Sequence, residues 1–142
     1  MQRQLTAPYT PQQNGVVERR NQTVVSMARC LLKARGVPVK FWGEAVTTAV
    51  YLLNRGTTKS VAGKTPYEAW HGRRPSVQHL RVFGCVVHVK VTRPNLKKLE
   101  DRSTPMVLFR YEAGSATYRV YDPATDRVHV SRDVMFEKEM LK

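Results

Sequence analysis

Acidic residues and cysteines are few in this chain of 142 residues, and long apolar runs are absent. No apolar stretch approaches the ~20 residues that a membrane-spanning helix needs, and the segment Met1–Gln4 lacks the apolar core of a signal peptide. These absences predict an intracellular protein with no membrane partner. Cys30 and Cys85 each lie in an apolar run without metal-ligand spacing, so we expect both to be reduced thiols in the core.

The shortage of acidic residues leaves a large positive charge on the chain. There are 24 Lys and Arg against 11 Asp and Glu, for a net charge of +13. Residues 1–72 hold ten basic and three acidic residues, and residues 73–142 hold fourteen and eight, so the charge is not confined to a tail. A globular chain with this charge is typical of nucleic-acid-binding proteins. Nonspecific attraction to anionic surfaces is the alternative.

The first half of the chain has the apolar spacing of helices. This spacing predicts helices over 16–34 and 40–55. A third, short helix is expected to start after Thr65, a natural N-cap residue, and to end at Gly72. The apolar stripe of the first helix consists of Val17, Val24, Met27, Ala28, Leu31 and Leu32.

The second half has the β-branched and aromatic runs of strands, separated by turn residues. Five strands are predicted, over 80–91, 106–111, 117–121, 127–131 and 134–136. Gly84 interrupts the first of these and is expected to mark a bulge or a close approach of another segment. Short strands at this spacing indicate a small β-barrel. We therefore expect two units, a helical one over 1–75 and a barrel over 76–138.

The most informative stretch runs from Pro8 to Asn21, where a polar loop with Pro and Gly leads into the first helix. Glu18 lies in the first turn and is the only acidic residue among the first 43, which carry seven Lys and Arg. A carboxylate there interacts favourably with the helix macrodipole, by up to about 1 kcal/mol. A single acidic residue kept within a basic segment nevertheless calls for an explanation.

This stretch resembles the last motif of the integrase catalytic core in Ty1/copia-type LTR retrotransposons. Later segments resemble the following parts of the same family, in the same order. They are Phe41–Ala45 with Tyr51–Arg55, then Lys64–Trp70, His79–Cys85 and Val130–Phe136. The resemblance runs from about Leu5 to Glu137, which is nearly the whole chain.

The resemblance implies an α+β chain, in which the C-terminal helices of a truncated ribonuclease-H-like integrase core precede a small SH3-like β-barrel. Such integrases hold two Mg²⁺ or Mn²⁺ ions with three carboxylates, Asp, Asp and Glu, for phosphoryl transfer. Glu18 matches the third carboxylate, as catalytic residue and metal ligand. The two Asp residues would lie upstream of Met1. We therefore expect strand transfer only in a full-length parent, and no metal bound by this chain alone.

The resemblance also implies DNA as the partner, both the element ends and the target, with the nucleus as the place of action. Candidate nucleic-acid-binding residues lie on and just before the first helix; they are Asn14, Arg19, Arg20, Asn21, Arg29 and Lys33. The alternative is that these residues form an ordinary solvated helix face. The helices would normally pack on a sheet contributed by the upstream region. We therefore expect the apolar stripe to be partly exposed here, favouring self-association or contact with that region.

One departure from the family falls in the second strand, where the family usually has Leu-Gly-Tyr and this chain has Phe109-Arg110-Tyr111. A distorted strand is expected at that point, because Gly serves backbone conformations that Arg adopts less easily. Two other interpretations stay open. The chain could be a noncatalytic or relic DNA- or protein-interaction module derived from a transposable element, or a relic with no selected role.

Overall fold

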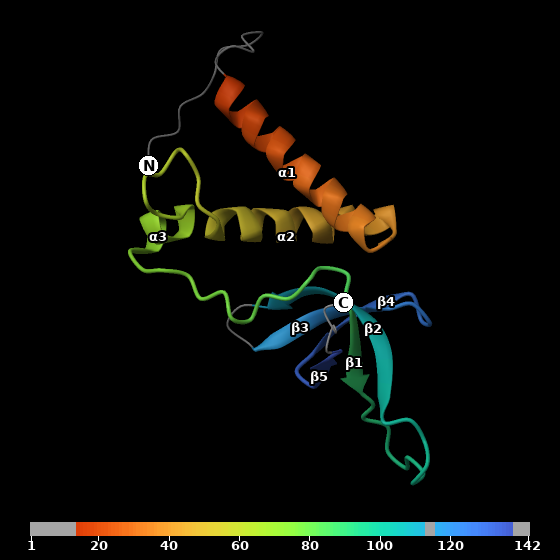
Figure 1. Cartoon of the computed structure of the whole chain (residues 1–142). Coiled ribbons are helices and arrows are strands. Elements are labelled where there is room, and N and C mark those ends of the chain that lie inside the picture. Colours follow the sequence, from red (N-terminus) through yellow and green to blue (C-terminus); the bar gives the residue numbers. More distant parts are fainter. Residues whose placement is uncertain (1–13, 113–115, 138–142) are drawn as a thin grey trace, which may run out of the picture.

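The computed structural model describes residues 14–112 and 116–137, and in these ranges three helices precede five strands (Figure 1). The helices are α1 (Gly15–Ala34), α2 (Trp42–Arg55), preceded by the 3₁₀ turn Val39–Phe41, and α3 (Pro66–His71). The strands are β1 (Val86–Lys90), β2 (Ser103–Glu112), β3 (Thr117–Asp122), β4 (Arg127–Ser131) and β5 (Val134–Phe136). The predicted α+β class is confirmed. The loop 8–13 of the integrase-like motif and Lys138 fall outside the described residues.

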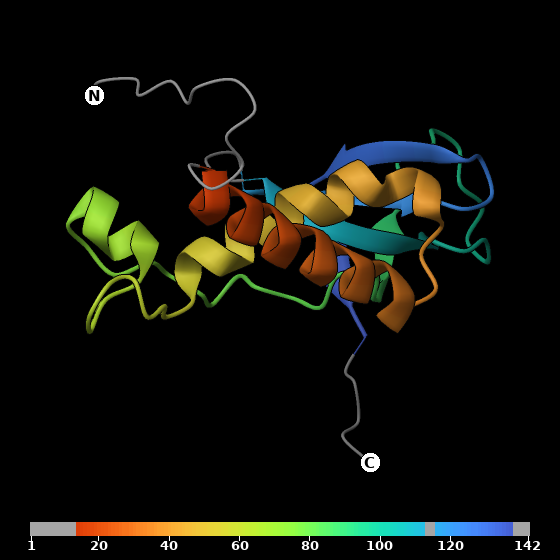
Figure 2. The ribbon, with the colours of Figure 1, turned by 90° about the horizontal axis from the view of Figure 1, so that it is seen from above.

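The strands form one antiparallel sheet in the order β4-β3-β2-β1-β5. Its two edge strands, β4 and β5, are separated in the chain only by Arg132 and Asp133. The sheet must therefore curl, because its two edges meet at this turn. Figures 1 and 2 show that α2 lies over the sheet and that α1 packs on α2, so α2 is the middle layer.

The predicted helix signals are confirmed. The hydroxyl of Thr65 accepts a hydrogen bond from the backbone N–H of Glu68 at 3.1 Å, which caps α3 at its start. Gly72 ends α3 with a φ of 73°, in the left-handed region that favours glycine. α1 begins one residue before its predicted start and ends at the predicted Ala34.

The prediction of a strand over the whole of 80–91 is wrong, because the strand is Val86–Lys90. Residues before it form turns: the N–H of Leu80 donates to the C=O of Val77 at 3.1 Å, and the N–H of Cys85 donates to the C=O of Val82 at 3.2 Å. The apolar composition of this run correctly indicates burial, since several of its side chains are buried or half-buried. They are buried in turns, however, and not in a strand that pairs with its neighbours.

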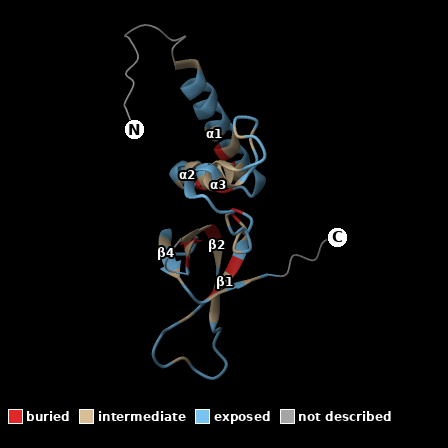
Figure 3. Cartoon of the chain, turned by 90° about the vertical axis from the view of Figure 1, so that its left-hand side faces the viewer, coloured by how far each residue is buried: buried red, intermediate tan, exposed pale blue. Residues whose placement is uncertain are grey.

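The helices and the sheet share one hydrophobic core. It joins Ala28 and Leu32 of α1, Ala45 and Ala49 of α2, and Phe109 and Tyr121 of the sheet, with Phe83 and Val37 from the connections. Val16 and Val17, in the first turn of α1, are 74% and 59% exposed (Figure 3 colours this end of α1 mostly as exposed). The apolar stripe is therefore exposed where it begins and buried where it reaches α2.

A second cluster lies on the other side of the sheet, around Val87, Leu108 and Val120. Cys85 packs against it and is half-buried, whereas Cys30 is exposed. The prediction that Cys30 lies in the core is wrong, because Leu31 and Leu32 fill the face of α1 that packs on α2 and Cys30 points away from it.

The β2–β3 ladder contains an irregularity between Leu108 and Arg110. Leu108 belongs to the cluster on the far side of the sheet, and Phe109 to the core under the helices. Strict alternation would return Arg110 to the side of Leu108, but the shift leaves it facing α2 beside Phe109. This is where the sequence predicts a distorted strand, and Arg110 tolerates it without a positive φ.

Gly84 is the point of closest approach between the sheet and the turn that joins α1 to α2. Its φ is +80°, and a Cβ built on it would lie 2.8 Å from Cβ of Arg35 and 2.9 Å from Cγ2 of Val37. Its N–H donates to the C=O of Leu108 at 2.7 Å, so the residue cannot shift without losing this bond. The predicted close approach at Gly84 is confirmed.

We expect Gly84→Ala to lower the free energy of unfolding by about 2–4 kcal/mol, since the methyl group overlaps its neighbours and the backbone is strained. Gly63→Ala is the matched control, because Gly63 has a φ of +68° with nothing within 4 Å. The control should lose only about 1 kcal/mol. Urea denaturation followed by circular dichroism measures both; equal losses would contradict a packing role for Gly84.

Candidate nucleic-acid interface

Glu18 is exposed in the first turn of α1. At 3.6 residues per turn, Arg29 lies about three turns further along on the same side of the helix. Asn21 lies one turn from Glu18, on the side that also carries Val17 and Ala28. Along this side of α1, Ala28 is buried against α2 whereas Val17 is exposed. Glu18 and Asn21 therefore border an exposed apolar surface.

The other predicted nucleic-acid-binding residues do not form one surface. Arg19, Arg29 and Lys33 are exposed on the outer side of α1. Arg20 points toward α2, where its guanidinium donates to the side-chain oxygen of Asn54 at 3.3 Å. Asn14 is half-buried at the start of the helix, and its side chain makes no capping hydrogen bond.

The carboxylates of the described residues do not fit a two-metal centre. Within residues 14–112 and 116–137 no group of three or more His, Cys, Asp and Glu lies close enough to hold a metal ion. Glu18 is the only acidic residue before Glu44, which belongs to an ion-pair network of its own. The described residues therefore contain no cluster of the three carboxylates that the implied chemistry needs.

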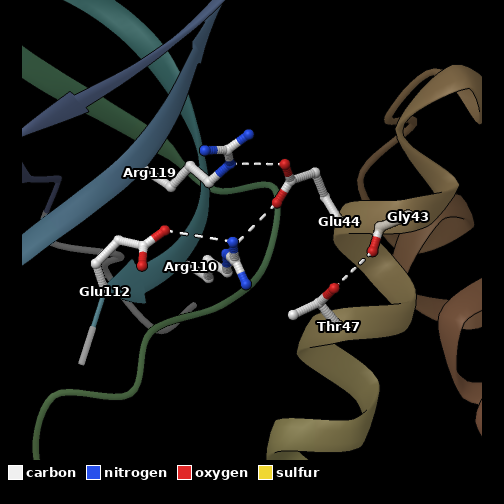
Figure 4. Close-up of polar contacts among 6 residues, drawn as sticks. All are labelled: Gly43, Glu44, Thr47, Arg110, Glu112 and Arg119. Atoms are coloured by element: carbon white, nitrogen blue, oxygen red, sulfur yellow. Dashed lines mark hydrogen bonds and ion pairs between the residues drawn. The ribbon is translucent and has the colours of Figure 1, made fainter.

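That network joins α2 to the sheet, and the sequence alone does not predict it (Figure 4). One carboxylate oxygen of Glu44 accepts a hydrogen bond from Nε of Arg119 at 2.6 Å, and the other lies 3.6 Å from Nε of Arg110. Arg110 also contacts Glu112 at 3.3 Å. Arg110 and Arg119 are directly opposite in the β2–β3 ladder, so Glu44 compensates a like-charge pair. The signal in the sequence is Arg110, where the family usually has Gly.

A second polar contact ties the turn before α2 to the β3–β4 hairpin. Lys40 and Tyr121 both donate to the carboxylate of Asp126. The hydrogen bond from Lys40, and then that from Tyr121, lowers the pKa of Asp126 below its ordinary value of 3.8. The same hydrogen bonds raise the pKa values of Lys40 and Tyr121. The ammonium group of Lys40 is thus already bound by a carboxylate of the same chain.

Arg55 is also engaged within the chain. Its guanidinium lies 3.4 Å from the ring centroid of Tyr51 and 4.7 Å from that of Tyr67. It donates to the backbone C=O of Tyr51 at 3.2 Å. This cation–π contact fixes α3 to the end of α2 and leaves little of Arg55 for an external anion.

A different group of cations has no such partners. These residues are exposed and make no ion pair with any residue that the structure describes; they are Lys90, Arg93, Lys97, Lys98, Arg102 and Arg132. Lys90, Arg102 and Arg132 line one shallow hollow beside β5. Sequence reasoning gives these residues no role, although Lys97 and Lys98 stand between two predicted strands.

None of the helices in the described ranges is long and apolar enough to cross a membrane.

Comparison with known proteins shows which protein family this chain resembles. Residues 85–142 match the retroviral polymerase SH3-like domain, a match that starts one residue before β1 and includes all five strands. The chain is 40% identical to the retrovirus-related Pol polyprotein from transposon TNT 1-94 of Nicotiana tabacum, over 96% of this chain and 10% of that polyprotein.

Two polyproteins of Arabidopsis thaliana show the same relationship. The chain is 34% identical to the retrovirus-related Pol polyprotein from transposon RE2 and 33% identical to that from RE1, over 92% of this chain and 9% of each polyprotein. The chain thus spans about a tenth of the length of these curated relatives. The resemblance to copia-type Pol polyproteins is confirmed.

We expect Glu44→Gln to lower the free energy of unfolding by about 1–3 kcal/mol, because it removes the negative charge that holds Arg119 by a hydrogen bond and Arg110 by an ion pair, and leaves Arg119 opposite Arg110 without this acidic partner. Glu68→Gln is the control, since its nearest cation, on the exposed Arg74, lies 4.0 Å away. The control should change stability by less than about 1 kcal/mol. Thermal and urea unfolding of both variants test this, and an unchanged stability of the Glu44→Gln protein would show that the network does not hold the helices to the sheet.

Proposed function

From the match to a copia-type Pol polyprotein region with a retroviral SH3-like domain at residues 85–142, we propose that this chain binds DNA during integration of the element. The observation that carries the proposal is the charge of +13 together with six exposed cations that have no ion-pair partner among the described residues. Phosphate groups supply the missing partners, and such contacts carry little sequence information.

Glu18 is the proposed third carboxylate of the integrase centre in a full-length parent. An upstream region would supply the two Asp residues, and the complete set would hold Mg²⁺ or Mn²⁺, which stabilises charge during phosphoryl transfer. The exposed position of Glu18 beside the uncovered Val17 supports docking of that region on the first turns of α1. The element ends and the target DNA are the proposed partners, and the nucleus is the proposed place of action.

A noncatalytic interaction module derived from a transposable element is the second candidate. It is favoured by the absence of a three-carboxylate cluster from residues 14–112 and 116–137. This module would bind DNA or a protein, and the two candidates differ in whether Glu18 matters to chemistry.

Binding of this chain to duplex DNA should depend steeply on salt. Between about 50 and 200 mM salt, a protein making 6–10 phosphate contacts loses on the order of 10³–10⁵ in affinity. Fluorescence anisotropy with two duplexes of unrelated sequence should give similar affinities and similar salt slopes. A slope near zero would argue against phosphate-dominated binding.

In a full-length integrase that contains this segment, Glu18→Gln should abolish 3′-end processing and strand transfer. Outer-shell changes at metal sites already cost 10–100-fold, so loss of a direct ligand should cost more than about 100-fold. DNA affinity should stay within about twofold, because one exposed acidic group opposes phosphate only weakly. Glu68→Gln serves as the control. Normal strand transfer by the Glu18→Gln enzyme would overturn the assignment of Glu18 as the third carboxylate.

A further inference from the structure

The connection between β1 and β2 projects from the sheet on the side away from the helices (Figures 1 and 3). We call residues 91–102 the arm. At its base the N–H of Val91 donates to the C=O of Arg102 at 2.9 Å, so both limbs leave the sheet together. Asn95 has a φ of 71°, a left-handed conformation that asparagine tolerates and that turns the outgoing limb. The arm is thus a defined protrusion of the sheet.

Leu99 is the large apolar side chain that the arm exposes most. The N–H of Glu100 donates to the C=O of Lys97 at 3.1 Å, closing a turn with Lys98 and Leu99 at its centre. The carboxylate of Glu100 accepts the N–H of Lys97 at 3.3 Å and holds the turn from the other side. Leu99 is 99% exposed, the highest value among the large apolar residues that the structure describes as exposed. The turn therefore holds Leu99 outward without a partner.

A single exposed leucine on a protein surface needs no explanation by itself. Leu99 differs because it lies on a closed turn in a segment rich in cations. Lys97 and Lys98 precede it directly, and Arg93 and Arg102 lie on the two limbs. The arm also contains two carboxylates. That of Glu100 accepts a hydrogen bond within the turn, and Asp101 is the other acidic residue of the arm. At the base, Lys90 and Arg132 line a hollow with Arg102, and Asp133 is the acidic residue of that lining.

We propose that the arm enters the minor groove of duplex DNA, with its lysines and arginines on the flanking phosphates and Leu99 as a wedge between base pairs. Proteins that kink DNA from the minor groove insert such apolar side chains and hold the phosphates with cations. An anionic membrane is a poorer fit, because one leucine buries too little apolar surface to hold a protein there. This inference rests on the proposed function, and it names the DNA-contacting surface and the mode of contact.

The charge of the arm is tested by the double variant Lys97→Gln/Lys98→Gln. Removing one lysine–phosphate interaction should reduce the slope of log affinity against log salt by about 1, so the double variant should reduce it by about 2. The matched control is Lys59→Gln/Lys64→Gln, which removes the same charge from two exposed residues between α2 and α3. The control should leave the slope nearly unchanged. Equal effects of the two variants would show that net charge alone matters and would overturn the role of the arm.

The wedge is tested with duplexes that carry 2-aminopurine, whose fluorescence rises when the base is unstacked. The wild-type chain should raise this fluorescence, and Leu99→Ser should abolish the rise while keeping the salt slope. Val77→Ser, at a residue that is 51% exposed before β1, is the control and should behave as wild type. Circular dichroism of each variant verifies that it is folded.

The outcomes separate this inference from the proposed function. A chain that binds no DNA overturns both. A chain that binds DNA with a steep salt slope, but without a Leu99-dependent fluorescence rise, overturns the wedge and leaves the proposed function standing. Binding to vesicles of phosphatidylserine and phosphatidylcholine that depends on Leu99, with no response from 2-aminopurine, assigns the arm to a membrane and overturns the inference.

Discussion

The packing of Phe109 joins the two halves of this protein, and the rest of the structure depends on it. The ring is 1% exposed, and its centroid lies 4.9 Å from that of Phe41, 5.6 Å from that of Phe83 and 6.0 Å from that of Tyr121. These rings come from the turn before α2, the segment before β1 and two strands. Aromatic contacts at such distances add to the hydrophobic gain of burial. The sheet is therefore the surface on which α2, and through it α1, is held.

Two groups of cations in the chain differ in their surroundings. Arg110 and Arg119 are balanced by Glu44, Lys40 by Asp126, and Arg55 by two tyrosine rings. All of these lie where helices meet the sheet or one another. The cations at the other end of the sheet lack ion-pair partners within the described ranges. The net charge therefore overstates how many cations could bind a polyanion where the helices meet the sheet. At the opposite end of the sheet, the cations are available to bind one.

The helices, the hairpin of β3 and β4, and the cap at Thr65 can be predicted because each is encoded by residues close together in the chain. The segment before Val86 is harder to predict, since apolar residues in turns have the same composition as a buried strand. Glu44 cannot be identified from the sequence as the partner of Arg119, because 75 positions separate them and only the packed fold brings them together. Glu18 can be proposed from its motif. That the arm cations lack ion pairs among the described residues depends on where the carboxylates lie in the folded chain, which the sequence does not give.

The irregularity at Phe109 has a consequence for how this sequence can drift. It turns two consecutive residues of β2 toward α2, so Arg110 faces Arg119 and both contact Glu44, while Arg110 also pairs with Glu112. None of these three positions is independent: losing the acid leaves two opposed cations, and losing both cations leaves a half-buried carboxylate. We therefore expect substitutions at this junction to be tolerated best as compensated sets, whereas the exposed face of α1 can change one residue at a time.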